Sequence, residues 1–280
     1  MNVTLPETKL YLKYKIIYSV IIGICILSII LVIYGQFIEG KTVTTIGNLK
    51  GKSEEGYEIL KTDFDKLFKN ELKNYDDKYK GKKEKLNQNL VYTSYKKVEN
   101  EENNYDISVR IPHINVKGEQ IEKYNKEIEN IFKNKAESIM ETKNKNSIYT
   151  VDYTAYIQDG ILSVAIKANL KEGNSAQRII AKTYNYSLDE DKEVNLEDVL
   201  KLENVQKEFV QSKIEQEVKN ENKKAEDLKA LGYDIFERDL NSDKYKVENI
   251  EEFYIDDGSI YIIFAYGNEK RTSEMDLVVI

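Results

Sequence analysis

One uninterrupted apolar stretch near the start of the chain, residues 16–38, limits what the whole molecule can be. It reads IIYSVIIGICILSIILVIYGQFI and contains no charged residue. At a rise of about 1.5 Å per residue, a helix of this length crosses a hydrocarbon core of roughly 30 Å. The sequence therefore predicts a transmembrane helix at 16–38, preceded by a polar leader at 1–15 and followed by one large soluble part.

Two other interpretations of the apolar stretch are disfavoured. A cleaved signal peptide has an apolar core of about 7 to 15 residues and a small-x-small cleavage site, whereas this run is longer and ends in IYGQF. Cys25 invites a lipoprotein interpretation, but Ile24 stands where a lipobox has a small residue. Lysines flank both ends of the run, and only the nearest ones favour a cytoplasmic leader. We expect a single-pass anchor in the cell membrane with the C-terminal part outside.

Composition narrows the function classes of the soluble part. The 42 basic and 49 acidic residues are interspersed along the chain, which argues against the clustered basic face that nucleic acid needs. The single cysteine lies in the apolar stretch, so the soluble part has no intrachain disulfide and no thiol zinc site. An abundance of Lys, Asn, Ile and Glu is typical of an AT-rich bacterial genome.

Residues 39–89 are expected to form a linker and an amphipathic juxtamembrane helix. Glycines at 40, 47 and 51 make the first part a flexible exit segment. Apolar residues then recur at three- and four-residue spacing from Tyr57 to Tyr79. The stripe is narrow and the heptads are not sustained, which favours a helix packed on its own domain. A homodimer through residues 57–79 is the alternative.

From Leu90 onward the pattern alternates between strands and helices. Strand patterns cover 105–111, 149–157, 161–170, 176–188, 253–255, 260–265 and 275–280, and helical patterns cover 119–141, 195–200, 205–220 and 225–231. Asp159–Gly160 supplies the positive φ that a hairpin turn needs. These elements predict an α+β fold of antiparallel hairpin sheets packed against amphipathic helices. We divide it into a first extracytoplasmic domain at 90–147 and a second at 148–280.

No pattern in the soluble part matches a catalytic or metal-binding signature. His113 is the only histidine and is interpreted as structural, with a pH-sensitive contact as the alternative. The acidic run 189–193 begins like a calcium loop, but Val194 stands where an EF-hand needs glycine. Asp256 and Asp257 would suit glycoside chemistry only as a pair, and a hairpin turn is their ordinary place. We expect no catalytic residue, no metal ligand and no cofactor.

Three segments carry a family resemblance. They are YDISVRIPHI (105–114), AKTYNYSLDEDKEVNLEDVL (181–200) and FYIDDGSIYIIFAYG (253–267). With their order, they make residues 90–280 resemble the paired extracytoplasmic domains of the lysozyme-sensing anti-sigma-V factors (RsiV-like proteins), which also precede the catalytic domain of some peptidoglycan deacetylases. The resemblance implies a receptor domain facing the cell wall, with lysozyme or a cell-wall glycan as its ligand.

Two loops depart from the family pattern. Where the second domain usually has a glycine-histidine turn, this chain has Glu172, Gly173, Asn174, Ser175, Ala176 and Gln177, and residues 268–273 replace an expected proline-glycine segment. Because binding specificity tends to reside in loops, we take 172–177 as the candidate ligand-contact loop. The leader 1–15 is too short to grip a sigma factor, and no deacetylase domain is recognisable.

These observations favour a non-enzymatic, membrane-anchored binding or sensing protein of the bacterial cell envelope. Its net charge of −7 suits a basic partner such as lysozyme, because complementary charge speeds association. Two alternatives remain. The chain is an accessory or binding component of peptidoglycan modification, or it is a structural stalk that dimerises.

Overall fold

The computed structural model describes residues 54–143, 146–233, 235–268 and 271–280 of the chain. These described residues belong to one compact unit. The expected leader, transmembrane helix (16–38) and exit segment lie outside the described residues. Within the described ranges, no helix is long and apolar enough to cross a membrane.

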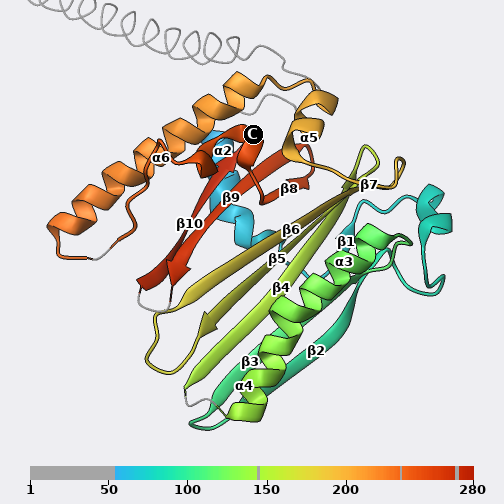
Figure 1. Cartoon of the computed structure of the whole chain (residues 1–280), viewed down its shortest axis with the longest axis horizontal. Helices are drawn as coiled ribbons and strands as arrows, with labels where there is room; N and C mark the ends of the chain where they lie inside the picture. The colour runs from blue at the N-terminus through green and yellow to red at the C-terminus, as the bar shows by residue number, and fades with distance from the viewer. Residues whose placement is uncertain (1–53, 144–145, 234, 269–270) are drawn as a thin grey trace, which may run out of the picture. The chain divides into compact units, whose positions relative to one another are not determined.

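A seven-stranded mixed sheet forms the larger part of this unit (Figure 1). Its main strand order is β2 (Val91–Glu101), β3 (Tyr105–Ile114), β4 (Ser147–Gln158), β5 (Ile161–Lys171), β6 (Arg178–Ser187) and β7 (Lys192–Glu193), with β1 (Leu72–Lys73) beside β4. The β4–β5 hairpin forms at Asp159–Gly160 as predicted. The sheet is not purely antiparallel, however, because β3 and β1 both pair with β4 in parallel. The parallel β3–β4 pair needs a crossover, which the helical segment between them supplies.

This crossover is the helical segment predicted at 119–141. It consists of α3 (Glu119–Ile128), a π-helical turn, η3 (Glu129–Lys133), and α4 (Asn134–Thr142). Its apolar stripe lies on one face of the sheet (Figure 1). Ile121, Ile128 and Phe132 are each at most 1% exposed, as are Val109 and Tyr149 of the sheet. One hydrophobic core therefore lies between the seven-stranded sheet and these helices.

A second, three-stranded sheet has the order β10 (Arg271–Val279), β9 (Ser259–Asn268) and β8 (Phe253–Asp256). It packs against α5 (Leu196–Leu202) and α6 (Lys207–Ala230) (Figure 1). The helices predicted at 205–220 and 225–231 are one continuous helix, and Gly232 follows its end with φ +87°. Two short 3-10 turns, η4 (Asp243–Tyr245) and η5 (Val247–Asn249), lead into β8.

Buried polar side chains join the two sheets. Ser163 donates its hydroxyl hydrogen to Asn185 Oδ1 at 2.6 Å, and the Ile255 amide donates to Ser163 Oγ at 3.0 Å. Asn185 Nδ2 donates to the Phe253 carbonyl at 2.9 Å. These bonds give hydrogen-bond partners to polar groups that would otherwise be buried and unsatisfied. The start of β8 is thereby fixed beside β6, although the two strands belong to separate sheets.

The helix predicted from Tyr57 to Tyr79 is shorter than its periodicity indicates. It runs as α2 (Glu54–Asp63) and a 3-10 turn, η1 (Phe64–Leu67), and the chain returns to helical geometry only at η2 (Asp77–Lys82). The prediction of one helix up to Tyr79 is therefore wrong beyond Leu67. Phe64 and Tyr79 are 1% and 3% exposed and join two different apolar clusters of the unit. The apolar stripe thus packs within its own domain, as its narrowness indicates.

Candidate functional site

The predicted contact loop 172–177 connects β5 to β6 and is anchored at its start. Glu172 accepts hydrogen bonds from Lys135 and Arg178, each at 2.7 Å. The Ser175 amide donates to the Glu172 carbonyl at 2.9 Å, and Gly173 has φ +52°, which glycine adopts without strain. Asn174 and Gln177 are exposed, while Ser175 and Ala176 are half-buried. The loop is therefore held at its base and presents amide side chains to solvent.

Gly173 and Asn174 line a hollow of about 550 Å³ at this end of the seven-stranded sheet. We call it the hairpin-end hollow. Its other walls are the β2–β3 turn and the start of β4. The lining residues are mostly amides and carboxylates: Asn100, Glu101, Glu102, Asn103, Asn104, Tyr105, Asp106, Asn146, Ser147, Ile148, Lys171, Gly173 and Asn174. Three segments that are distant in sequence, one of them containing the predicted loop, thus meet around the hollow.

Strand register explains how these residues meet. Asn100 pairs with Asp106, Asp106 with Ile148, and Ile148 with Lys171, so the four residues form one row across β2, β3, β4 and β5. Residues paired in register point to the same face of a sheet. All four are exposed, and Ile148 keeps 48% of its surface accessible. The row is a polar surface with one apolar side chain in the middle.

The turn beside this row is partly preorganised. Asn103 and Asn146 adopt φ +65° and +58°, a region that asparagine tolerates better than most residues. Glu101 accepts hydrogen bonds from Asn104 Nδ2 at 3.0 Å and Lys143 Nζ at 2.9 Å. The hydrogen bond from Lys143 lowers the pKa of Glu101 below its ordinary value. Glu101 is therefore ionised at neutral pH, with Lys143 as its counter-charge.

The carboxylates that resemble catalytic or calcium-binding residues in the sequence lie in ion pairs and turns. Asp256 is buried and accepts from Lys73 Nζ at 3.0 Å, while Asp257 takes φ +47° in the β8–β9 turn. Asp191 is ion-paired with Lys82 at 2.8 Å in the β6–β7 turn. Among the described residues, no group of three or more His, Cys, Asp or Glu side chains is placed to hold a metal ion.

His113 lies at the end of β3 and is half-buried. Its ring packs against Tyr92, with ring centroids 5.4 Å apart. Its Nε2 atom is buried and has no hydrogen-bond partner among the described residues. It lines a separate hollow beside α3 rather than the hairpin-end hollow.

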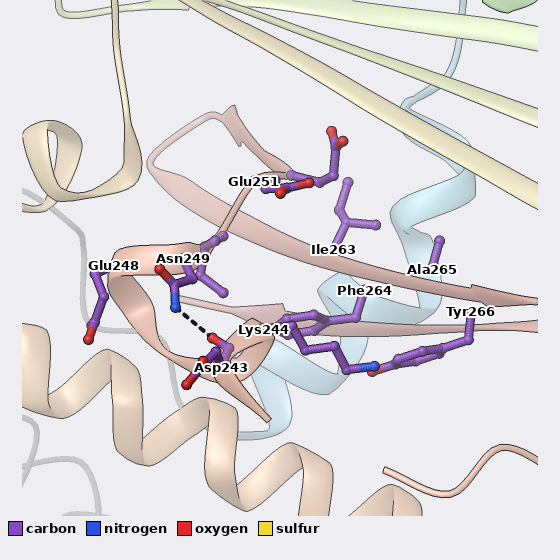
Figure 2. Close-up of a pocket in the computed structure, with 11 residues that line it drawn as sticks. Asp243, Lys244, Glu248, Asn249, Glu251, Ile263, Phe264, Ala265 and Tyr266 are labelled. Atoms are coloured by element: carbon purple, nitrogen blue, oxygen red, sulfur yellow. Dashed lines mark hydrogen bonds between the residues drawn. The ribbon is translucent and has the colours of Figure 1, made fainter. Parts of the chain in front are cut away.

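A second pocket of about 550 Å³ lies beside β9 and was not anticipated from the sequence. Figure 2 shows it between the η4–η5 segment and the strand, with Lys244 beside Tyr266 and Glu251 toward Ile263. The Lys244 ammonium lies 4.2 Å from the ring centroid of Tyr266 and 4.8 Å from that of Tyr245. We call this pocket beside β9 the β9-edge pocket. In the sequence, the only indications of this site are the adjacent Lys244 and Tyr245 and, at the end of a predicted strand, Tyr266.

A buried polar network supports the floor of the β9-edge pocket. Tyr266 donates its hydroxyl hydrogen to Asp276 Oδ2 at 2.9 Å, and its hydroxyl lies 3.0 Å from that of Tyr245. Asp276 is also paired with Arg238 at 2.6 Å. Burial, followed by the charge of Asp276, raises the pKa of Tyr266 well above its ordinary value. Tyr266 is therefore fixed in position as a neutral ring.

Comparisons with known proteins give similarity at low identity. No protein-family model and no curated protein matches the sequence. A DUF3298 family protein from Pseudomonas aeruginosa PAO1 is similar with a TM-score of 0.37 and 11% identity, over 68% of this chain and 88% of that one. A DUF3298 family member from Bacteroides fragilis NCTC 9343 is similar with a TM-score of 0.31 and 13% identity, over 61% of this chain and 80% of that one.

Proposed function

We propose that this chain is a single-pass, membrane-anchored binding or sensing protein of the bacterial cell envelope, with its α+β unit outside the membrane and without enzymatic activity. Its ligand is a cell-wall glycan or lysozyme, bound at the hairpin-end hollow. The anchor is the apolar stretch 16–38, whose length suits a membrane span. The observation that carries the proposal is the meeting of the contact loop 172–177 with a polar hollow.

The lining of the hollow suits a sugar. Side-chain amides both donate and accept hydrogen bonds, and carboxylates accept them, which matches the many hydroxyls of a glycan. The exposed Ile148 offers an apolar contact for the C–H face of a sugar ring. Five asparagines and three acidic residues line the hollow against one lysine. The excess of carboxylates also suits a basic protein such as lysozyme.

Calorimetry on the full chain in detergent tests the ligand. Soluble peptidoglycan fragments and lysozyme are titrated separately at physiological salt. The double variant Asp106→Ala/Asn174→Ala removes two exposed side chains of the hollow, and we expect the Kd to rise about tenfold, the equivalent of one strong polar contact. The matched control Asn220→Ala/Asp227→Ala changes the same residue types on exposed positions of α6 and should leave the Kd unchanged.

Two results would contradict this proposal. Binding of neither ligand would remove both ligand classes. Equal weakening by the two double variants would move the binding surface away from the hollow. Topology is tested independently, because protease added to intact wall-stripped cells should remove the mass after Lys41, and protection of that mass would place the unit on the other side.

A further inference from the structure

β9 has a backbone edge that is left open inside the β9-edge pocket. Pairing with β8 ends at Phe253 and Ile262, followed by one hydrogen bond from the Ile263 amide to the Glu252 carbonyl at 2.9 Å. Successive strand residues direct their amide and carbonyl groups to opposite edges, so Ala265 presents its groups on the same edge as Ile263. Across the described residues, β9 is paired at Ala265 only with β10, on its other edge.

This edge is accessible to a ligand. Ala265 is exposed and lines the pocket together with Ile263 and Tyr266. An unpaired strand edge is a template for an added strand, and extended peptides are often recognised in this way. The Ala265 amide and carbonyl therefore supply one donor and one acceptor for a chain lying along β9.

Charge determines which peptide suits the pocket. Asp243 on the rim is ion-paired with Lys246 at 2.6 Å. Glu248 is ion-paired with Lys207 at 3.1 Å and shares this lysine with Glu197. Lys244, in contrast, has no carboxylate within ion-pair distance among the described residues and rests on two aromatic rings. Burial lowers the pKa of Lys244, and the nearby Arg238 charge acts in the same direction, while the charge of Asp276 opposes both. An incoming carboxylate would offset both effects.

We propose that the β9-edge pocket binds an extended peptide, which adds as a strand to β9 and places a carboxylate side chain on Lys244. The register follows from Figure 2, where Lys244 lies at the Tyr266 end of the exposed edge and Glu251 lies toward Ile263. A carboxylate is attracted at the first end and repelled at the second. This surface shares no residue with the hairpin-end hollow, so the inference does not depend on the ligand proposed there.

Fluorescence anisotropy with synthetic peptides tests the proposal on the full chain. The probe is a labelled octapeptide of alternating threonine and valine with one central aspartate. A second peptide has asparagine in place of the aspartate, and a third has the aspartate but carries an N-methyl group on every backbone amide, so that neither of its edges can donate to a strand. We expect the aspartate peptide to bind about tenfold more tightly than the asparagine peptide, and the N-methylated peptide not to bind, since it cannot pair with a strand edge.

Protein variants locate the peptide. Lys244→Met keeps the side-chain stem but removes the charge, and it should weaken the aspartate peptide about tenfold while leaving the asparagine peptide unchanged. Lys244→Arg should restore binding of the aspartate peptide. The matched control Lys219→Met alters an exposed lysine on α6 and should have no effect. Ala265→Pro removes only the amide on the open edge and should weaken both peptides.

Each outcome decides the proposal. The full pattern supports it, and thermal unfolding of each variant verifies that the fold persists. Equal affinities for the aspartate and asparagine peptides, with no effect of Lys244→Met, would remove Lys244 from the site. No saturable binding of any peptide would overturn strand addition. Light scattering that shows self-association abolished by Ala265→Pro, without peptide binding, would also overturn the proposal and assign the edge to a second copy of the chain.

Discussion

Arg238 and Asp276 form a two-point ion pair inside the protein. Arg238 Nε donates to Asp276 Oδ2 at 2.6 Å and its Nη2 donates to Oδ1 at 2.8 Å. The two side chains are 3% and 2% exposed. Arg238 belongs to a segment without regular secondary structure, whereas Asp276 lies in β10. The pair therefore fixes an irregular segment to the sheet and, through Tyr266, positions the floor of the β9-edge pocket.

Removing one member of this pair should be costly. Asp276→Asn leaves the Arg238 guanidinium buried without its main counter-charge, and we expect the free energy of unfolding to fall by about 3 kcal/mol. Urea denaturation of the variant and the wild type measures the difference. The control Glu221→Gln removes an exposed ion pair with Lys224 on α6 and should cost at most about 0.5 kcal/mol. Similar losses in the two variants would show that Arg238 and Asp276 act as a solvated pair.

Two hairpin turns provide an internally matched test of steric fit. Gly160 and Gly258 each follow an aspartate and have φ +80° and +72°, so alanine is strained at both positions. A Cβ on Gly160 would clash with Asp189 Oδ2, whereas nothing lies within 4 Å of a Cβ on Gly258. We expect Gly258→Ala to cost about 1 kcal/mol and Gly160→Ala to cost about 1 kcal/mol more. Equal urea midpoints would show that Asp189 moves away freely.

Local patterns in the sequence predicted most elements of the fold. The segment 119–141 formed a continuous helical crossover because its apolar residues repeat with the helical period over more than five turns. The Asp159–Gly160 turn formed because these residues tolerate positive φ. The helix predicted from Tyr57 to Tyr79 ends at Leu67, and tertiary contacts place Phe64 and Tyr79 of its apolar stripe in two different cores. Apolar periodicity shows which residues would share one face of a helix. It does not show against which hydrophobic cluster these residues pack.

Features that depend on non-local pairing could not be read from the sequence. The crossover helices connect β3 to β4, and the parallel register of these strands places Asp106 beside Ile148. Both residues line the hairpin-end hollow. The loop 172–177 stands out in the sequence by its departure from a family pattern, but the sequence does not show which residues it meets. The β9-edge pocket depends on where β8 begins. The hydrogen bonds from the Ile255 amide to Ser163 Oγ and from Asn185 Nδ2 to the Phe253 carbonyl fix that point. Those bonds leave no trace in local periodicity.

His113 should make stability depend on pH in mildly acidic solution. Burial is the main cause that lowers its pKa, and the Lys85 charge adds to it, while Glu84 and Glu129 oppose it. The unfolded chain, with an ordinary histidine pKa of about 6.5, therefore binds a proton before the folded chain does. The free energy of unfolding should thus fall as pH decreases below about 6.5.

The variant His113→Gln isolates this contribution, because the chain contains no other histidine. Urea midpoints measured at about pH 7.5 and about pH 5.5 should differ less for the variant than for the wild type. The carboxylates contribute equally to both proteins, so the difference between the two slopes reports on position 113 alone. Identical slopes would show that His113 is protonated in the folded protein as readily as in the unfolded chain.

Tyr254 should make the protein sensitive to alkaline pH. Its hydroxyl is buried between the two sheets, 3.1 Å from Thr154 Oγ1, and donates to Asp256 Oδ2 at 3.3 Å. Burial raises the pKa of Tyr254 well above the ordinary value of 10.0, and the charge of Asp256 adds to this effect. Above about pH 10, the unfolded chain loses this proton while the folded chain keeps it, so stability falls as pH rises further. Below that pH, the contribution of Tyr254 to stability is fully present.

The variant Tyr254→Phe separates the two roles of this hydroxyl. At neutral pH it should lower the free energy of unfolding by about 1 kcal/mol, because Thr154 loses a hydrogen-bond partner. Above about pH 10, its stability should decline less steeply than that of the wild type, by about 1.4 kcal/mol per pH unit for one fully protected group. Urea denaturation across this range, with Tyr233→Phe at a position that is 63% exposed as the control, gives both quantities. Parallel curves of stability against pH for the wild type and Tyr254→Phe would contradict this prediction. They would mean that Tyr254 ionises in the folded protein, so that its hydroxyl is accessible to solvent.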